Sequence, residues 1–434
     1  MKSQRYFARS AYTSLLAACL LTACLSDTSL LVTSAQAGDW TRFRGSGGSG
    51  EAATEQCPST WSSEENLAWK TPLPGRGLSS PIVVSDRVFV TACSGVRQDR
   101  LHVLCFDQQN GQQLWERQFW ATGRTQTHAK TNTAAPTPVS DGSVVYALFS
   151  TNDLFALDLD GNLLWLRGLT QEYPNASNSL GMASSPIVAG GNVIVLLETD
   201  SQAVALGIDS QTGSTSWELE RPHSANWTSP TLLKNAAGEP IVALQSSKGM
   251  SAHNPQTGTQ LWNFERGCAS TPSSASAGDV AYVPSSGLVA LRGSSLSGTP
   301  EVLWESSRLQ PSTPSPLLAN DRLFVINRSI LKCADPATGE VAWQLRIEGD
   351  FTSSPVSAGK LIYVFNEAGV GQVIEDMGES GRIVGGGDLK ETLLCTPAVA
   401  HNAIFVRSDQ HLFKIASGTV ETDRLRAAPS PHQE

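Results

Sequence analysis

The stretch Gly207-Ile-Asp-Ser-Gln-Thr-Gly-Ser-Thr-Ser-Trp217 decides the fold of this chain, because close copies of it recur. It returns as Ala252-His-Asn-Pro-Gln-Thr-Gly-Thr-Gln-Leu-Trp262 and as Cys333-Ala-Asp-Pro-Ala-Thr-Gly-Glu-Val-Ala-Trp343. Each copy has a small residue, then Asp or Asn, a glycine and finally a tryptophan. Repeats of roughly 40–50 residues built from short strands are typical of a β-propeller, in which each unit packs mainly on its neighbours.

Tryptophans mark this repeat along most of the chain, which contains eleven of them. The seven that keep the spacing are Trp69, Trp115, Trp165, Trp217, Trp262, Trp304 and Trp343. Five have a glycine four residues earlier: Gly111, Gly161, Gly213, Gly258 and Gly339. Glycine tolerates the positive φ of a tight hairpin turn. We therefore predict that these twelve residues serve the scaffold, which leaves few unusual residues for chemistry.

A Ser-Pro or Thr-Pro dipeptide followed by an apolar run is the second landmark. It occurs eight times, at Ser80-Pro81, Thr137-Pro138, Ser185-Pro186, Ser229-Pro230, Thr271-Pro272, Thr313-Pro314, Ser354-Pro355 and Thr396-Pro397. Proline is tolerated at the first residue of a strand, so each is predicted to begin the innermost strand of a unit. Turn signals divide each unit into four short strands. The sequence thus predicts an all-β protein, an eight-bladed β-propeller of four-stranded antiparallel blades.

The closure of the ring is predicted from an unpaired strand at each end. The unit that begins at Pro397 contains no tryptophan strand, whereas Leu67-Ala-Trp69 precedes the first Ser-Pro. We expect residues 66–70 to pair with the last unit, which removes an open sheet edge. The predicted organisation is a signal peptide at 1–37, an N-terminal extension at 38–60, the propeller at 61–420 and a polar C-terminal tail at 421–434.

The first 37 residues have the features of a targeting segment. Lys2, Arg5 and Arg9 precede a small and apolar stretch that is too short to span a membrane as a helix. Two processing sites and an uncleaved anchor remain open. Ala35-Gln-Ala37 fits signal-peptide cleavage, while Leu21-Thr-Ala-Cys24 resembles a bacterial lipobox, which would leave a lipidated Cys24 as the one membrane anchor. Either predicts an exported protein of the periplasm or outer membrane.

The net charge narrows the classes of partner, and the cysteines raise the separate question of disulfide bonds. The chain has a net charge of −9, and because residues 1–37 carry Lys2, Arg5, Arg9 and Asp27, the remainder carries −11. An acidic body without a Lys/Arg run argues against nucleic acid, which proteins hold chiefly through phosphate contacts. Export permits disulfides, but spacing alone does not give their connectivity.

The repeat segments resemble those of quinoprotein-type (PQQ-like) eight-bladed propellers, over residues 61–416. The length, the leader and the propeller-only layout are most similar to the BamB-like group of that family. The stretch Trp40-Thr-Arg-Phe-Arg-Gly45 resembles a secreted subgroup of PQQ-like repeat proteins. The resemblance implies that each tryptophan packs against the neighbouring blade, over its glycine-bearing turn. It also implies a non-enzymatic scaffold that binds envelope proteins, as BamB does in outer-membrane protein assembly.

A cofactor is not expected, although the family name suggests one. Quinoprotein dehydrogenases hold PQQ and a cation with carboxylate and amide ligands, and many have a disulfide between adjacent cysteines. This chain has no adjacent cysteines, and no acidic set in it matches theirs. A PQQ- and calcium-dependent oxidoreductase therefore remains the alternative to a scaffold, and the sequence leaves open whether the protein is an enzyme.

Other catalytic and metal-binding patterns are equally weak, and we assign no catalytic or metal-ligating residue. The seven histidines are scattered, and His102 is interpreted as an ordinary strand residue. No GxSxG motif points to a serine hydrolase. Gly45–Gly50 fits GxGxxG by letter, but it follows no buried strand and is interpreted as a flexible lead-in.

Two regions remain as a candidate binding surface. One is the long interval Glu116–Ala135, and the other is the set of residues just before each Ser/Thr-Pro, predicted to surround one mouth of the axial channel. The candidate residues are Trp120, Arg124 and His128 from the first region, and Arg76, Asn132, Trp227 and Phe351 from the second. A third function, a propeller that binds carbohydrate or another small molecule, would use Trp227 or Trp120 as a stacking platform.

Overall fold

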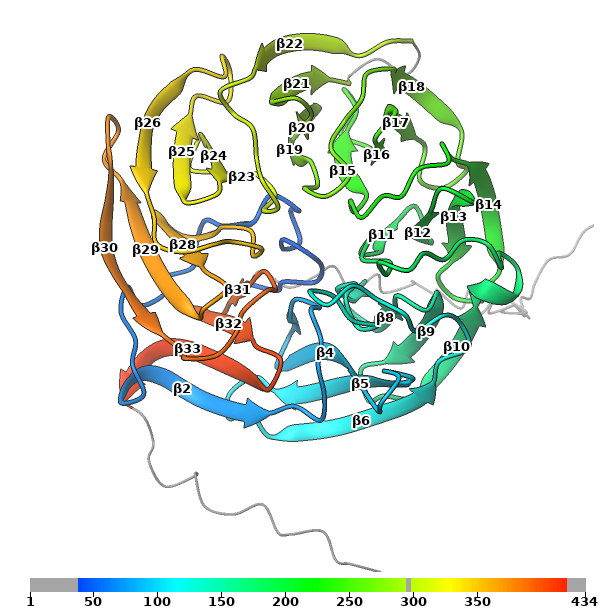
Figure 1. Cartoon of the computed structure of the whole chain (residues 1–434), viewed down its shortest axis with the longest axis horizontal. Coiled ribbons are helices and arrows are strands. Elements are labelled where there is room, and N and C mark those ends of the chain that lie inside the picture. Colours follow the sequence, from blue (N-terminus) through cyan, green and yellow to red (C-terminus); the bar gives the residue numbers. More distant parts are fainter. Residues whose placement is uncertain (1–37, 294–297, 420–434) are drawn as a thin grey trace, which may run out of the picture. The chain divides into compact units, whose positions relative to one another are not determined.

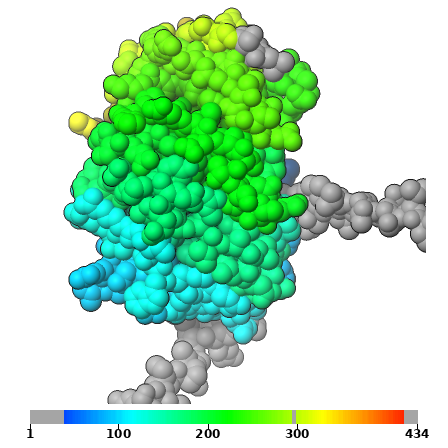
Figure 2. All heavy atoms as spheres, turned by 90° about the vertical axis from the view of Figure 1, so that its right-hand side faces the viewer, coloured from blue at the N-terminus to red at the C-terminus, as the bar shows by residue number. Residues whose placement is uncertain are grey.

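The described residues form eight sheets around a central axis (Figure 1), and their strands pair antiparallel except for one parallel pair, residues 51–52 with residues 357–358. The computed structural model describes residues 38–293 and 298–419. The predicted signal peptide at 1–37, with Cys24, and the predicted tail at 421–434 lie outside the described residues. Seven sheets have four strands and the other has five, so the prediction of an all-β, eight-bladed propeller is confirmed. On the side of the ring that Figure 2 shows, the blades follow one another in sequence order, from cyan through green to yellow.

The first four blades contain strands β3 to β18. The first blade has β3 (Ile82–Val84), β4 (Arg87–Ser94), β5 (Arg100–Asp107) and β6 (Gln113–Trp120). The second has β7 (Val139–Ser140), β8 (Val144–Leu148), β9 (Asp153–Asp158) and β10 (Leu163–Gly168), followed by the 3-10 helix η1 (Leu169–Gln171). The third has β11 (Ile187–Ala189), β12 (Asn192–Glu198), β13 (Ala203–Asp209) and β14 (Thr215–Glu220). The fourth has β15 (Thr231–Lys234), β16 (Pro240–Ser246), β17 (Gly249–His253) and β18 (Gln260–Phe264).

The last four blades contain the remaining strands. The fifth has β19 (Ala275–Ala277), β20 (Val280–Pro284), β21 (Leu288–Arg292) and β22 (Glu301–Ser306). The sixth has β23 (Leu317–Ala319), β24 (Arg322–Asn327), β25 (Ile330–Ala334) and β26 (Val341–Arg346). The seventh has β27 (Val356–Ala358), β28 (Leu361–Phe365), β29 (Val370–Asp376) and β30 (Gly381–Asp388), with β1 (Glu51–Ala52) at its inner edge. The eighth has β31 (Ala398–Ala400), β32 (Ala403–Arg407), β33 (His411–Thr419) and β2 (Glu65–Pro72).

The innermost strand of each blade begins beside the Ser/Thr-Pro landmark, with two corrections. In six blades the strand starts directly after the proline named above, as β3 does after Pro81. In the fifth and sixth blades, β19 follows Ser274 and β23 follows Pro316. The equivalent positions in those two blades are therefore Ser273-Ser274 and Ser315-Pro316, two residues later than Thr271-Pro272 and Thr313-Pro314. The Ser/Thr-Pro pattern occurs twice within Thr313-Pro-Ser-Pro316, which explains the misplacement there.

The repeated tryptophans pack across the boundary between blades. A Cβ atom on the turn glycine of one blade would lie only 2.5–2.9 Å from the indole of the preceding blade. These pairs are Trp69 with Gly111, Trp115 with Gly161, Trp165 with Gly213, Trp217 with Gly258 and Trp304 with Gly339. All five glycines also have positive φ, between 70° and 81°. Each of the five indole N–H groups donates to a backbone carbonyl of the next blade, so the motif links neighbouring blades.

The outer strand of the eighth blade comes from the N-terminal part of the chain. Strand β2 pairs antiparallel with β33, and Trp69 lies opposite Lys414. Figure 1 shows β2 in blue beside β33 in red, although about 340 residues of sequence separate Lys70 from its partner Phe413. The contribution of this pairing to the stability of the ring stays a prediction.

Residues 38–60, here called the N-terminal segment, cover one face of the ring. The segment accepts backbone hydrogen bonds from Ser140 of the second blade, Leu318 of the sixth and Ser357 of the seventh. Its Gly45–Gly50 stretch is folded by its own hydrogen bonds, for example from the Gly50 N–H to the Arg44 carbonyl at 2.9 Å. The expectation of a flexible lead-in is therefore wrong, because this stretch is part of the packed structure.

Candidate functional site

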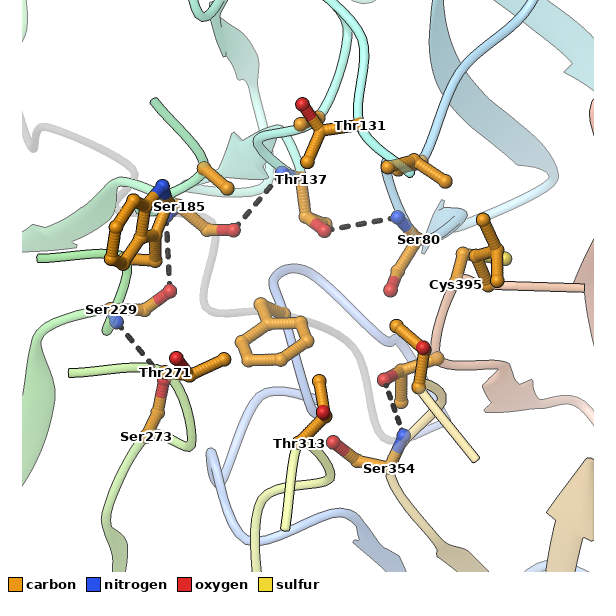
Figure 3. Close-up of a pocket in the computed structure, with 18 of the residues that line it drawn as sticks. Ser80, Thr131, Thr137, Ser185, Ser229, Thr271, Ser273, Thr313, Ser354 and Cys395 are labelled. Atoms are coloured by element: carbon orange, nitrogen blue, oxygen red, sulfur yellow. Dashed lines mark hydrogen bonds between the residues drawn. The ribbon is translucent and has the colours of Figure 1, made fainter. Parts of the chain in front are cut away.

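A ring of hydroxyl groups surrounds the axis where the inner strands begin (Figure 3). Its members are Ser80, Thr137, Ser185, Ser229, Ser273, Ser315, Ser354 and Thr396. Each of the first seven donates its backbone N–H to the side-chain oxygen of the next member, at 3.0 Å. Among the described residues none of the eight hydroxyls has an acceptor for its own hydrogen. The ring therefore turns a set of O–H donors toward the axis.

This ring forms the wall of an axial cavity of about 360 Å³. Phe43 of the N-terminal segment lines it together with Leu78, Leu180, Trp227 and Leu394, which add apolar surface to the hydroxyl wall. Further hydroxyls come from Thr131, Thr271, Thr313 and Thr352. A cavity with mainly apolar walls and a few converging polar groups is the usual form of a small-molecule site.

Phe43 is held in place by the two arginines that flank it. The Arg44 guanidinium, 2% exposed, donates to the Ser274 carbonyl at 2.9 Å and also bonds the Pro316 carbonyl. Burial, and then the neighbouring charge of Arg42, lower the pKa of Arg44 to about 9, so the side chain stays protonated at neutral pH. Arg42 donates to the Ser46 carbonyl within the segment. The loop that contains Arg42 and Arg44 therefore holds the Phe43 ring against the blades, on the axis of the cavity.

At the opposite end, a loop from the first blade reaches across to the seventh. The Lys130 ammonium bonds both carboxylate oxygens of Glu367, at 2.8 and 3.1 Å, and Glu367 also accepts from the Thr352 hydroxyl at 2.7 Å. Hydrogen bonding to Glu367 raises the pKa of Lys130. Burial raises the pKa of Glu367, but the bonds from Lys130 and Thr352 outweigh it, and the net pKa is lowered. We call this pair the Lys130–Glu367 bridge.

Of the seven predicted surface residues, two line the cavity. These are His128, whose backbone N–H donates to the Leu180 carbonyl, and Trp227. The Trp227 indole N–H donates to the Gly181 carbonyl at 2.8 Å. Asn132 and Phe351 are buried behind the lining rather than within it. Arg76 is engaged in an ion pair with Asp409 at 3.0 Å.

The remaining two candidates lie away from the cavity. Trp120 is the last residue of β6 and is 63% exposed, so residues 116–120 continue a strand and the long loop begins only at Ala121. Arg124 lies in that loop and donates to Gln126.

Phe43 and the hydroxyl ring are not among the site residues predicted from the sequence. Phe43 belongs to the Trp40–Gly45 stretch, whose resemblance to a secreted subgroup was its only signal. Six of the eight ring hydroxyls belong to the Ser/Thr-Pro landmark, and Ser273 and Ser315 lie two residues after Thr271 and Thr313. The landmark was used only to place the inner strands. Its regular occurrence at every inner strand was the signal that could have placed the ring on the axis.

The donor set of this cavity does not fit the cation site of quinoproteins. No Asp or Glu is among the described residues that line it, whereas the resemblance implies carboxylate ligands for the cation that accompanies PQQ. Elsewhere, the described ranges contain no group of three or more His, Cys, Asp or Glu side chains that could hold a metal ion. All six described cysteines are free thiols. No helix among these residues is long and apolar enough to cross a membrane.

The family of the chain is given by its match to a sequence model. The sequence model of the family described as outer membrane protein assembly factor BamB matches residues 60–180, 176–344, 291–384 and 327–423. The chain belongs to the BamB family. The BamB of Moranella endobia (strain PCIT) is 32% identical over 127 residues, 29% of each chain. The BamB of Burkholderia pseudomallei (strain K96243) is 26% identical over 194 residues, 43% of this chain and 42% of that one. The matches thus span less than half of these BamB relatives.

Solved structures show the same fold at low sequence identity. The crystal structure of BamB from Moraxella catarrhalis superposes with a TM-score of 0.59 at 17% identity, covering 83% of this chain and 99% of that one. A europium-containing methanol dehydrogenase superposes with a TM-score of 0.66 at 11% identity, covering 87% and 91%. A BamB and a methanol dehydrogenase thus share the propeller, so the fold alone does not give the function.

Proposed function

We propose that this protein is a binding scaffold of the bacterial cell envelope that takes part in outer-membrane protein assembly, as the name of its BamB relatives states. The observation that carries the proposal is the BamB family match, which extends from residue 60 to residue 423 and so includes all eight blades. A rigid ring that presents loops to a protein partner fits this role. The partners are envelope proteins, and the acidic body makes nucleic acid an unsuitable one.

The face that carries the cavity mouth is the better docking surface. The N-terminal segment covers the opposite face, where it bonds the turns after the inner strands, such as Gly359. The mouth face instead presents Leu180, 44% exposed, beside His128 and Trp227. Exposed apolar side chains next to polar loops are typical of protein-binding surfaces.

Photo-crosslinking in an envelope extract tests the docking proposal. A photoreactive phenylalanine analogue is placed at Leu180, and in a matched control at the exposed Lys360 on the covered face. We expect Leu180 to crosslink to a component of the outer-membrane protein assembly machinery and Lys360 not to do so. Products from cytosolic proteins alone, or equal products from both positions, would contradict the proposal.

The location follows from the leader, which supports export to the periplasm with outer-membrane association. Cleavage after Ala37 would release a soluble protein, whereas processing before Cys24 would leave a lipid anchor. Mass spectrometry of the mature N-terminus separates the two processing sites. An intact Met1 in the envelope fraction would contradict both.

A second candidate function is binding of a small oxygen-rich molecule in the axial cavity, without PQQ or a metal. The hydroxyl ring offers donors to several acceptor oxygens, and Trp227 offers an aromatic face, which are the groups that bind carbohydrates. A glycan array tests this function, with Trp227→Ala as the control. Titration with PQQ and Ca²⁺ tests the oxidoreductase alternative, because saturable quenching of tryptophan fluorescence would favour the cofactor. A flat titration would favour the cofactor-free scaffold.

A further inference from the structure

The first blade holds a serine, a histidine and a glutamate in one hydrogen-bonded line. The Ser94 hydroxyl lies 2.7 Å from Nε2 of His102, and Nδ1 of the same ring lies 2.6 Å from Oε1 of Glu116. The His102 side chain is 4% exposed and that of Glu116 is 21% exposed, while Ser94 is half-buried. Nucleophile, base and orienting carboxylate within hydrogen-bond reach are the signature of an activated serine.

The register of three adjacent strands produces this line. His102 on β5 lies opposite Ala92 on β4 and opposite Gln118 on β6. Side chains two residues apart on a strand share a face, so Ser94 and Glu116 lie on the same face as His102, on its two sides. These strands are eight residues long, compared with five and six for β8 and β9, so the first blade extends further than the second.

The hydrogen bonds assign a role to each ring nitrogen. An ionised Glu116 only accepts, so Nδ1 of His102 carries a proton and Nε2 is free to accept the Ser94 hydroxyl hydrogen. Glu116 is itself oriented by the Gln118 amide, which donates to Oε1 at 2.8 Å. The imidazole thus has the tautomer that a general base for serine requires.

Groups that could bind a substrate lie beside Ser94 on the same face. Arg100 is paired directly with Ser94 on one side and with Trp120 on the other. Its guanidinium stacks on the exposed Trp120 ring at 3.9 Å, and its Nε is a buried donor without a hydrogen-bond partner. The exposed turn Gly95–Arg97 follows Ser94, and in the described residues the backbone N–H groups of Val96 and Arg97 have no acceptor. Such N–H groups after a nucleophile can stabilise an oxyanion.

A second serine–histidine pair in the chain shows the contrast. His253 bonds the Ser251 hydroxyl through Nε2 at 2.9 Å, but its Nδ1 faces the Gly258 carbonyl rather than a carboxylate. Ser251 also accepts from the buried Arg221. Ser251 and His253 are both buried, so substrate has no access to them. The Ser251–His253 pair therefore serves as an internal control, because its hydrogen bond is structural.

We propose that Ser94, His102 and Glu116 form an acyl-transfer site that hydrolyses carboxylic esters whose apolar part lies on Trp120. Ser94 Oγ forms a bond to the ester carbonyl carbon while its proton passes to His102 Nε2. The carbon–oxygen bond of the ester then breaks, and the alcohol leaves with that proton. His102 Nε2 then accepts a proton from water while the water oxygen bonds to the acyl carbon. The bond from that carbon to Ser94 Oγ breaks, the carboxylic acid is released, and the proton passes from Nε2 to Oγ. This activity is separate from the scaffold function and does not depend on it.

Labelling with a fluorophosphonate tests the nucleophile directly on the mature chain. We expect one phosphonylated residue, Ser94, identified by peptide mass spectrometry, while the Ser251 peptide stays unmodified in the same sample. Because general base catalysis contributes about 10²–10⁴-fold, His102→Gln is expected to slow labelling by that factor. Labelling of Ser94 at the same rate as exposed serines elsewhere, or no labelling of Ser94, would overturn the proposal.

Hydrolysis of p-nitrophenyl butyrate separates the positioning and binding roles. Glu116→Gln is expected to lower kcat with KM unchanged, because the carboxylate orients the imidazole without contacting substrate. Trp120→Ala is expected to raise KM with kcat nearly unchanged. Thermal melting of each variant shows whether it is folded, and the wild-type labelling result stands if one is not. Equal changes in both variants, or a turnover that Ser94→Ala retains, would contradict the assignment.

Discussion

The sixth and seventh blades solve the same packing problem in different ways. In the sixth blade, Cys333 lies opposite Trp343, whose indole packs on the next blade against Gly381. In the seventh, the equivalent pair is Val373 and Gly385, so the tryptophan is missing. Trp61 from the N-terminal part of the chain lies there instead, 4% exposed and 5.4 Å from the Phe365 ring.

The difference shows that the N-terminal part of the chain is a structural component of the ring. Three glycines leave room for it, since a Cβ at Gly385 would lie 2.1 Å from the Ser59 carbonyl oxygen. At Gly371 and Gly387 a Cβ would lie within 2.2 Å of Trp61 atoms. The same part of the chain supplies β2 to the eighth blade and Phe43 to the cavity. The blade without its own tryptophan is therefore packed by a segment about 300 residues away in sequence.

Removal of residues up to 75 is expected to have the largest effect. It deletes Trp61 and Trp69 together with the β2 edge strand, and truncation of one buried tryptophan alone costs about 3–5 kcal/mol. A combined loss above roughly 6 kcal/mol is comparable with the whole stability of a domain. We expect a sharp fall in Tm by circular dichroism. An unchanged Tm would show that the ring closes without this strand.

Single tryptophan substitutions test whether the borrowed ring is equivalent to the repeated ones. We expect Trp262→Ala, at a position 1% exposed, to cost about 3–5 kcal/mol in denaturant unfolding while leaving partner specificity intact. Trp61→Ala should fall in the same range. Trp343→Ala should cost about 1 kcal/mol more than Trp61→Ala, because its indole also bonds Asp376 at 2.8 Å. A loss below about 1 kcal/mol for Trp61→Ala would mean that the seventh blade does not need it.

Gly385→Ala tests the same site from the other side. The added methyl group would overlap the Ser59 carbonyl, so we expect overpacking to cost about 1–3 kcal/mol. Gly47→Ala is the matched control, because a Cβ there meets its nearest atom at 3.7 Å, and its effect should stay within about 0.5 kcal/mol. If the two variants melt alike, residues 59–61 do not pack against β30 as described.

The fold was predictable because its determinants are local and repeated. Every blade has its own inner strand and five have the turn glycine of the repeat, so the copies reinforce one another even where Thr271 and Thr313 mark the wrong position. The N-terminal segment has no such repeat. Arg44 contacts Ser274 and Pro316, and no local sequence pattern predicts contacts between residues so far apart in the chain.

The candidate sites were less predictable for a related reason. Trp227 was predicted because it lies just before a Ser-Pro landmark and His128 because it lies in the long interval Glu116–Ala135, whereas Phe43 reaches the cavity from a distant segment. His102 was predicted to be an ordinary strand residue, and it does lie within the regular strand β5. Its two partners come from neighbouring strands, so only the register of the sheet reveals the line from Ser94 to Glu116.

The smallest effect is expected at the Lys130–Glu367 bridge, a contact between blades that uses charge instead of an aromatic ring. Lys130 is 64% exposed at its side chain, so Lys130→Ala should change stability by no more than about 1 kcal/mol. Because the pKa of Glu367 lies below its ordinary 4.5, the bridge is fully formed above that pH and is lost as the pH falls through the lower value. The raised pKa of Lys130 means that the bridge is also fully formed below pH 10.5 and is lost at higher pH. Melting of Lys130→Ala against wild type, with Lys360→Ala as the control, should show a difference between these limits that disappears in acid. A difference that grows in acid would assign the stabilisation to another group.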